Sequence, residues 1–367
     1  MTDDGDSLDA ASAAQPKDRP TRRGRRLLFK LLVLSASLLL GLLLGEISLR
    51  LFFGYAGYRG QAFSRPDPEL SWVNKPLADV EVRGRDYSYL VHVNSLGFRG
   101  AELRASAGSR ILLLGDSYTF GQGVDNNETF PAHLQSLFTS AGRKDVEVVN
   151  GGVYGYGARQ ASGLAHREWD EVKPSVVIFT HCGNDFADDL RFSQGNYKRI
   201  RNVVPGRQFL REHSALYHFL ARKVVTLFSK LGIHNRNIRF EQPGEGGLVS
   251  DMGKKWEESR NLTCGALDGL KKICQERGAR FFVTTVGFGW WRGTERPRFS
   301  TDAETIREHC LSQGIPFLDP VVAFPSEKKE LWFNQSSVGH FSTLGNQLFS
   351  KSLFAGLKAA GALTLGK

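Results

Sequence analysis

A single long apolar run near the N-terminus is the feature that most constrains how this 367-residue chain can fold. Leu27 to Gly45 reads LLFKLLVLSASLLLGLLLG, about the length that an α-helix needs to cross the hydrocarbon core of a membrane. Lys30 lies near one end of the run, where its long side chain can reach the interface. No later segment approaches this run, which excludes a transporter with many spans. The remainder of the chain must therefore fold in water.

The flanks of the apolar run predict its orientation. Basic residues crowd the stretch from Lys17 to Lys30, whereas those beyond Gly45 are sparse. The positive-inside rule therefore predicts a cytoplasmic N-terminus, with the bulk of the chain periplasmic or extracellular. A cleaved signal peptide is the alternative, although no convincing small-residue cleavage site follows Gly45.

The chain divides into four predicted parts. We expect a disordered basic cytoplasmic tail over residues 1–26 and a transmembrane signal-anchor helix over 27–45. A linker with a small β-hairpin follows over 46–105, where prolines precede the alternating stretch YSYLVHV. The main domain covers residues 106–367 and contains a basic insert at about 186–255, which its core does not need.

The composition, with 41% hydrophobic and 23% charged residues, is that of a globular protein and excludes the collagen-like and disulfide-framework classes. The net charge of +10 is concentrated in two basic islands, one before the apolar run and one in the insert. Neither island accompanies a nucleic-acid module, so membrane lipid or an anionic substrate is the expected partner and nucleic acid is not. Four cysteines follow no metal or disulfide spacing, and most of them are expected in the core: Cys182, Cys264, Cys274 and Cys310.

Within the insert, Ser214 to Leu231 has apolar residues at helical spacing and basic residues elsewhere, which predicts an amphipathic basic helix. Three interpretations stay open. The helix packs on the domain with a solvated charged face, or it forms a lid, or it rests on an anionic membrane surface.

The main domain alternates short apolar strands with helical segments. Strands are predicted at RILLLGDS, DVEVVNGGV, SVVIFTHCGND, ARFFVTTVGFGW and PFLDP, with helices between them and a closing helix from Thr343. This alternation predicts an α/β fold with a mainly parallel sheet covered by helices on both faces.

In such a sheet, ligands bind beyond the carboxyl ends of the strands. The residues at these ends are Gly115-Asp116-Ser117, Asn150-Gly151-Gly152, Gly183-Asn184-Asp185 and Gly287 to Trp291. They include neither the lysine-containing glycine loop of a nucleotide site nor a cluster of metal ligands, so no cofactor and no metal are expected. They do offer a serine and hydrogen-bond donors, which are the parts needed for nucleophilic attack on a carbonyl group.

Four segments, taken together and in order, resemble the SGNH (GDSL-type) hydrolase superfamily. They are GDSYTFGQGV, NGGVYGYG, GND and the His-x-x-x-x-Gly of His340 to Gly345. The preceding NSLGFRG resembles a segment common in bacterial membrane-anchored members. The resemblance covers about Arg110 to Gly356 and implies a three-layer α/β/α fold with a flavodoxin-like sheet.

The resemblance also implies roles for individual residues. Ser117 is the expected nucleophile and His340 the general base. The oxyanion hole is expected from the backbone N–H groups of Ser117 and Gly152 and the side-chain amide of Asn184. Such a site performs acyl transfer through a covalent acyl-serine.

One departure from the family pattern concerns the acid of the triad. Members usually have an aspartate three residues before the histidine, where this chain has Ser337. A catalytic dyad is one interpretation, with Ser337 or a backbone carbonyl holding the imidazole ring. Asp185 and Asp319 also follow strands and are alternative acids, while Asp116 belongs to the first block and is expected to be structural.

Trp290 and Trp291 follow the fourth long strand at the same edge of the sheet. They could bind a sugar or line an acyl pocket, or one could be core and the other surface. The sequence thus predicts a single-pass membrane protein whose exported serine esterase acts on an O-acylated cell-envelope glycan or lipid. The alternatives are an O-acyltransferase that uses the same serine, and a binding protein of the same fold that has lost catalysis.

Overall fold

The computed structural model describes residues 22–53, 63–83, 88–195, 210, 214–217, 219–220, 223, 249–286, 288–289, 298–320 and 340–362. The chain forms two compact units, residues 1–55 and 56–367. Most of the expected tail and of the expected basic helix from Ser214 to Leu231 lies outside the described residues. The predicted domain boundaries themselves stay predictions.

The first unit consists of helix α1, Arg22–Phe53. A stretch of α1 from Arg25 to Phe52 is long and apolar enough to cross a membrane. The helix is longer than the predicted 27–45 at both ends, because the flanking residues contain no proline to end it. Near its C-terminal end, Arg50 Nη2 lies 2.7 Å from Glu46 Oε1, an ion pair one helical turn apart.

The second unit is built on a parallel sheet, and this confirms the predicted α/β fold. Strands β5 and β7 lie at its centre, in the order β6-β5-β7-β8. The sheet strands are β5 (Ser109–Gly115), β6 (Val146–Gly152), β7 (Val176–His181) and β8 (Arg280–Thr285). The predicted strand PFLDP forms only a single parallel bridge, between Phe317 and Val283 of β8. When this bridge is counted as a fifth strand next to β8, the strand order is flavodoxin-like.

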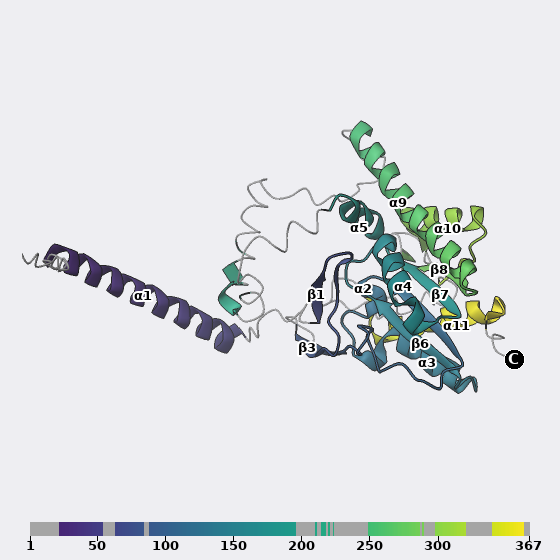
Figure 1. The fold of residues 1–367 in the computed structure, drawn as a ribbon, viewed down its shortest axis with the longest axis horizontal. Helices are drawn as coiled ribbons and strands as arrows, with labels where there is room; N and C mark the ends of the chain where they lie inside the picture. The colour runs from purple at the N-terminus through teal and green to yellow at the C-terminus, as the bar shows by residue number, and fades with distance from the viewer. Residues whose placement is uncertain are drawn as a thin grey trace, which may run out of the picture. The chain divides into compact units, whose positions relative to one another are not determined.

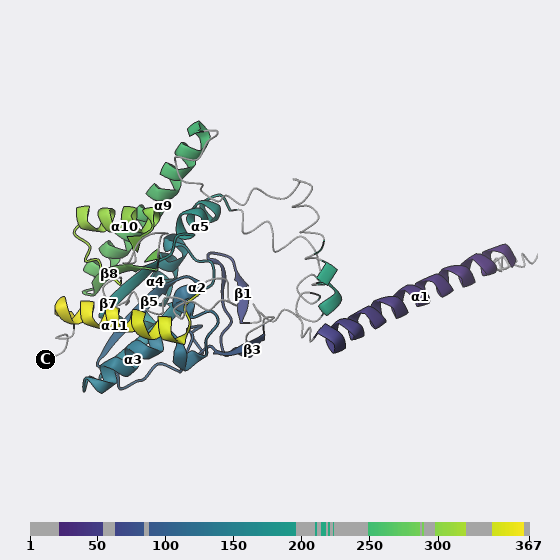
Figure 2. The same cartoon turned by 180° about the vertical axis from the view of Figure 1, so that it is seen from behind.

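Helices cover both faces of this sheet (Figures 1 and 2). On one face, seen in Figure 1, lie α4 and α9; on the other, seen in Figure 2, lie α3 and α11. The helices are α2 (Ser117–Phe120), α3 (Phe130–Ser140), α4 (Ala158–Val172), α5 (Asp185–Ser193), α9 (Val249–Glu276), α10 (Thr301–Ser312) and α11 (Thr343–Ala359), with a 3₁₀ turn η1 (Asn126–Glu128). The α9 helix thus begins inside the predicted insert.

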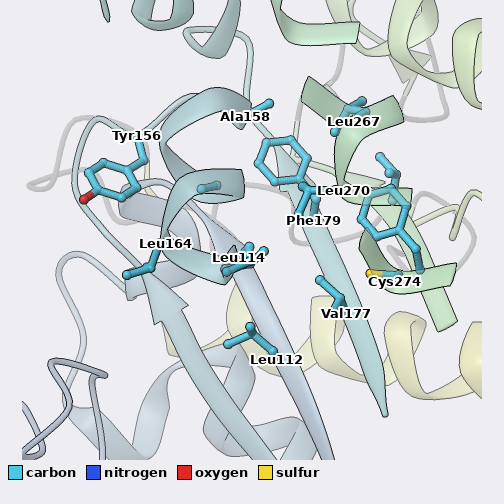
Figure 3. Packing of buried hydrophobic residues seen from close by; sticks show 14 of the residues in the cluster. Leu112, Leu114, Tyr156, Ala158, Leu164, Val177, Phe179, Leu267, Leu270 and Cys274 are labelled. Carbon is cyan, nitrogen blue, oxygen red and sulfur yellow. The ribbon is translucent and has the colours of Figure 1, made fainter. Parts of the chain in front are cut away.

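The strands alternate between the two cores, because successive side chains of a strand point to opposite faces. Leu112 and Leu114 of β5 pack toward α4 and α9, while Ile111 and Leu113 pack toward α3 and α11. Figure 3 shows the first of these cores, where strand side chains meet Leu267 and its neighbours on α9. Three of the cysteines are buried, as predicted, and Cys182 is half-buried; none of the four forms a disulfide.

Asp189 of α5 links its own helix to α4 and α9. Its carboxylate accepts hydrogen bonds from the Ala158 and Arg159 N–H groups at the start of α4, at 3.2 and 2.9 Å, and from Thr263 Oγ1 of α9, at 2.7 Å. The N-terminus of α4 has no side-chain cap of its own, so Asp189 supplies it from another helix. Burial raises the pKa of Asp189 to about 6.

Two small antiparallel sheets precede the main sheet. Strand β1 (Ser64–Asp67) pairs with β2 (Ser71–Asn74), and β3 (Asp79–Arg83) pairs with β4 (Ser88–His92). A further two-stranded pair, β9 (Phe288–Gly289) with β10 (Arg298–Phe299), follows β8.

Arg99, from the segment NSLGFRG, joins the β3–β4 hairpin to the end of α2 and the loop that follows it. It is only 4% exposed, and burial lowers its pKa to about 10, which leaves it charged at neutral pH. Its side-chain N–H groups donate to Asn126 Oδ1 (2.8 Å) and to the carbonyls of Leu90 (2.9 Å), Phe120 (2.8 Å), Gly121 (2.6 Å) and Val124 (2.8 Å). The guanidinium therefore satisfies backbone carbonyls that would otherwise be buried without donors.

Arg99→Lys should lower the free energy of unfolding by about 2–4 kcal/mol, because an ammonium cannot reach all of these acceptors. Arg143→Lys is the matched control. Arg143 pairs with Asp145 at the surface, at 2.9 Å, and we expect a change within about 0.5 kcal/mol. Denaturant unfolding of both variants, followed by near-ultraviolet circular dichroism, measures the difference; equal stabilities would contradict the role given to Arg99.

Candidate active site

Ser117 stands in a sharp turn at the carboxyl end of β5. Gly115 has φ +152°, and a Cβ there would lie 2.3 Å from Thr119 Oγ1, so only glycine fits. Asp116 is the N-cap of α2 and accepts from the Tyr118 N–H at 2.9 Å. Gly121 ends α2 with φ +91°, and its N–H donates to the carbonyls of Ser117 (3.0 Å) and Tyr118 (3.1 Å). The motif GDSYTFG is therefore a one-turn helix between two glycines that permit its entry and exit.

His340 meets Ser117 from the far end of the chain. Its Nε2 lies 2.7 Å from Ser117 Oγ. His340 comes just before α11, which is capped by Ser342 accepting from the Gly345 N–H at 3.2 Å. Asn346 of α11 in turn accepts from the Phe130 N–H at the start of α3, at 2.9 Å, and this bond anchors α11 beside α3. The structure thus brings the predicted nucleophile and the predicted base within hydrogen-bond distance.

Asp116 lies buried directly beneath this pair. Its Oδ2 is 3.4 Å from Ser117 Oγ, farther than His340 Nε2, so the shorter contact for the serine proton is with the imidazole. The Cys182 thiol donates to the same carboxyl. Burial raises the pKa of Asp116, which the Tyr118 N–H and the nearby His340 oppose.

Asn184 lies in the loop between β7 and α5, at the N-terminus of α5. Its Nδ2 donates to Asp188 Oδ2 at 2.7 Å, and Arg191 Nη1 donates to Asp188 Oδ1 at 2.8 Å. A primary amide has two N–H donors. The Asp188 carboxylate therefore holds the amide through one N–H group, and the second N–H makes no hydrogen bond to another described residue.

Gly152 is the last residue of β6, and its polar groups are already used. Its N–H donates to Asn150 Oδ1 at 3.0 Å, and its carbonyl accepts from Asn74 Nδ2 at 3.1 Å. A Cβ on Gly152 would lie 2.1 Å from the Phe120 N atom, so the residue is a close-contact point between β6 and α2. The Gly152 N–H, which was the expected oxyanion donor, is therefore hydrogen-bonded to the Asn150 side chain.

The turn directly after Gly152 contains another backbone N–H group, that of Gly155. The Tyr156 N–H donates to the Val153 carbonyl at 3.2 Å, and Gly155 inside this turn has φ +68°. The Val153 N–H donates to the Gly115 carbonyl at 3.0 Å, so the turn leaves the sheet beside the strand that leads to Ser117. Gly155 is half-buried, and its N–H makes no hydrogen bond to another described residue.

The remaining predicted residues are placed as follows. Asp185 is fully buried; its Oδ2 accepts from the Cys182 N–H at 3.0 Å and lies 3.0 Å from His181 Nδ1. Asp319 is exposed, and its carbonyl accepts from Ser352 of α11. Ser337, Trp290 and Trp291 lie outside the described residues. Within the part of the chain that is described, no group of three or more His, Cys, Asp or Glu residues is placed to hold a metal.

Three residues of the site were not singled out from the sequence: Gly155, Asp188 and Tyr118. The run NGGVYGYG contains several glycines, and only the structure separates those inside β6 from the one in the following turn. Asp188 lies one helical turn after Asn184, a spacing that does predict a contact on one helix face. The ring of Tyr118 lies against His340, a contact between distant segments that no local spacing encodes.

Residues 113–348 match the model of the GDSL-like Lipase/Acylhydrolase family, and the chain belongs to this family. The family establishes the general activity class as hydrolysis of acyl esters. No curated protein matches the chain.

Several solved structures are similar to the chain at low identity. A putative lipolytic protein of the G-D-S-L family from Desulfitobacterium hafniense is 13% identical, with 68% of this chain and 100% of that chain covered and a TM-score of 0.36. Esterase EstA from Pseudoalteromonas sp. is 14% identical (69% and 99% covered, TM-score 0.37). The acetylxylan esterase Axe2 from Geobacillus stearothermophilus is 13% identical (70% and 96% covered, TM-score 0.36).

Gly152→Ala should destabilise the protein by about 3 kcal/mol, because the added methyl group would overlap the backbone of Phe120. Gly265→Ala is the matched control: it lies within α9 with nothing inside 4 Å of the new Cβ, and should raise the stability by up to about 1 kcal/mol. Thermal unfolding of both variants measures the two changes. A Gly152→Ala protein as stable as the parent would contradict the close contact between β6 and α2.

Proposed function

We propose that the chain is a serine esterase of the SGNH type that acts outside the cytoplasm on an O-acylated cell-envelope glycan or lipid. The observation that carries the proposal is the 2.7 Å contact between Ser117 Oγ and His340 Nε2, at the carboxyl edge of a parallel sheet in a GDSL-like chain. An intact nucleophile and base favour an enzyme over a binding protein that has lost catalysis.

In the proposed mechanism, His340 Nε2 removes the Ser117 proton as Oγ attacks the ester carbonyl. The negative charge that develops on the carbonyl oxygen is stabilised by hydrogen-bond donors of the oxyanion hole. His340 then gives the proton to the departing alcohol, which leaves an acyl group on Ser117. Water, deprotonated by His340, attacks this acyl-serine, and the proton returns to Ser117 as the acid leaves.

We assign the oxyanion hole to the Ser117 N–H, the Asn184 amide and the Gly155 N–H. Gly155 takes the place expected for Gly152, because the Gly152 N–H is bonded to Asn150 and the Gly155 N–H has no such partner among the described residues. Asp188 supports the assignment by holding the Asn184 amide at 2.7 Å. Because Ser337 stands where the family usually has an aspartate, the proposal includes a catalytic dyad of Ser117 and His340.

The apolar helix supports a location at the cell envelope. The leucine side chains of α1 from Leu27 to Leu44 are exposed within the described residues, and burying such side chains in lipid removes their contact with water. We propose that α1 is a signal anchor with its arginine-rich end in the cytoplasm. An esterase held there reaches acyl esters of envelope glycans and lipids before those of cytoplasmic metabolites.

Asn184→Ala should lower kcat by about 10²–10³, the usual cost of losing one oxyanion donor, while the fold is kept. Ser117→Ala should reduce hydrolysis of 4-nitrophenyl acetate to the uncatalysed rate. Both rates are measured on the full chain in detergent, with circular dichroism as the control for folding. Hydrolysis by Ser117→Ala at the parent rate would refute the site.

Asp188→Ala should lower kcat about tenfold if the carboxylate acts by orienting Asn184. The same change introduced into Asn184→Ala should then have almost no further effect, because the group that it orients is gone. The comparison is therefore between the loss of kcat that Asp188→Ala causes in the parent protein and the loss that it causes in Asn184→Ala. Equal losses in both backgrounds would show that Asp188 acts independently of the amide.

The proposed topology predicts that alkaline phosphatase fused after Lys367 is active only outside the cytoplasm. Sodium carbonate extraction should leave the protein in the membrane fraction, because an uncleaved anchor is integral to the bilayer. A soluble exported product that lacks residues up to Gly45 would identify α1 as a cleaved signal peptide. An inactive fusion would overturn the orientation.

Adding an O-acetylated polysaccharide such as acetylxylan, or a short-chain acyl lipid, distinguishes the substrate classes by release of the acid. Adding an unacetylated polysaccharide as acceptor distinguishes hydrolysis from acyl transfer. We expect free acid as the main product. Quantitative transfer of the acyl group to the acceptor would favour the O-acyltransferase.

A further inference from the structure

The aromatic ring of Tyr118 lies against the imidazole ring of His340. The ring centroids are 4.6 Å apart, and the ring planes are tilted by 31°. Tyr118 is the residue directly after Ser117, so the nucleophile and this ring belong to the same short helix α2. The imidazole therefore contacts two neighbouring residues of α2, Ser117 through Nε2 and Tyr118 through the ring face.

We propose that Tyr118 is a positioning residue for the general base. Its ring holds the His340 imidazole in line with Ser117 Oγ and stabilises the imidazolium that forms when His340 accepts the Ser117 proton. This inference rests on the proposed function and deepens it. It supplies one physical interaction that favours the cation in a site where Ser337 replaces the usual aspartate.

The distance suits such an interaction, and both rings are half-buried. A cation within about 6 Å of a ring centroid is attracted by the electron-rich face of the ring, and the attraction is stronger where water is excluded. Burial raises the pKa of the Tyr118 phenol, so the side chain is neutral at every working pH. The same ring stacks on neutral histidine less favourably than on the cation. The contact therefore strengthens as the proton moves from serine to histidine, which is the requirement for a faster chemical step.

The surroundings of Tyr118 keep its ring in place. Its N–H donates to Asp116 Oδ1 at 2.9 Å, the bond that also fixes the start of α2. Phe341 packs edge-on against the ring, with centroids 5.2 Å apart and planes at 82°. Phe341 in turn contacts Phe349 of α11, at 5.3 Å between centroids. The ring is thus held from the nucleophile side and from the base side at once.

Other titratable groups of the described residues lie near the imidazole or next to a group that does. The Asp116 carboxyl faces it from the start of α2, and the Cys182 thiol approaches from the end of β7 through its bond to that carboxyl. Both are unchanged when only residue 118 is altered. A series of variants at position 118 therefore isolates the contribution of the ring.

The test uses the full chain in detergent with 4-nitrophenyl acetate as the substrate, over a range of pH. Tyr118→Phe keeps the ring face and should retain kcat/KM within about twofold. Tyr118→Leu removes the ring and should lower the plateau of kcat/KM about 3- to 10-fold. It should also move the acidic limb of the profile to lower pH by about half to one unit, because the inactive imidazolium loses its stabilisation.

A second series replaces Tyr118 with 4-fluoro- or 3,4,5-trifluorophenylalanine, and Tyr118→Phe is the unfluorinated reference. If Tyr118 had a purely structural role, the pH profiles of these proteins would be the same. Fluorine withdraws charge from the ring face with little change in shape, so the plateau and the acidic limb should shift in graded order. Phe138→Leu is the matched control, because it removes a buried ring of α3 away from His340. We expect its acidic limb to stay in place even if its stability falls.

Each outcome decides the inference. Equal profiles for the phenylalanine and trifluorophenylalanine proteins, or an unshifted acidic limb in Tyr118→Leu, would overturn it while Ser117-dependent hydrolysis leaves the proposed function standing. Equal activity of the parent and Ser117→Ala would overturn the proposed function, and this inference with it. A graded loss across the fluorinated series establishes the cation–ring contact.

Discussion

The turn at Gly115 is the constraint on which the rest of the site depends. It ends the central strand β5 in a conformation that a side chain would block, with Thr119 Oγ1 at 2.3 Å and the Thr180 carbonyl at 2.9 Å from the position of a Cβ. Through this turn Asp116 caps α2, and Ser117 rises above the carboxyl edge of the sheet. The neighbouring strands then deliver the Val153 turn on one side and Asn184 on the other, because parallel strands end at a common edge.

Beneath that edge lies a polar layer, formed by the buried Asp116, His181 and Asp185 and the half-buried Cys182. Burial raises the pKa values of both carboxyls and of the thiol, and lowers the pKa of His181 to about 3. Unfavourable ionisation at this depth is offset by hydrogen bonds to the Tyr118 and Cys182 N–H groups. The hydrogen bonds of this layer hold the loops that carry Ser117 and Asn184, which suits a preorganised site.

The sequence could predict the sheet and its flanking helices, because strand periodicity is a local signal. The pairing of Ser117 with His340 was implied by the resemblance of four ordered motifs to a known family. The sequence could not predict that the Gly152 N–H is bonded to Asn150 while Gly155 lies in the following turn, since that depends on where β6 ends. The role of Arg99 could not be predicted either, because all but one of its acceptors are backbone carbonyls, which carry no sequence signature. The stacking of Tyr118 on His340 required the tertiary fold to bring together residues from opposite ends of the domain.

The central claim is that Ser117 is a nucleophile activated by His340, and covalent trapping tests it most directly. A fluorophosphonate probe is incubated with the full chain in detergent, and the modified residue is located by mass spectrometry of the digested protein. The account predicts a single phosphonyl adduct on Ser117, and its loss when His340 is replaced by alanine. An adduct on another serine with Ser117 unmodified, or labelling that persists without His340, would contradict it.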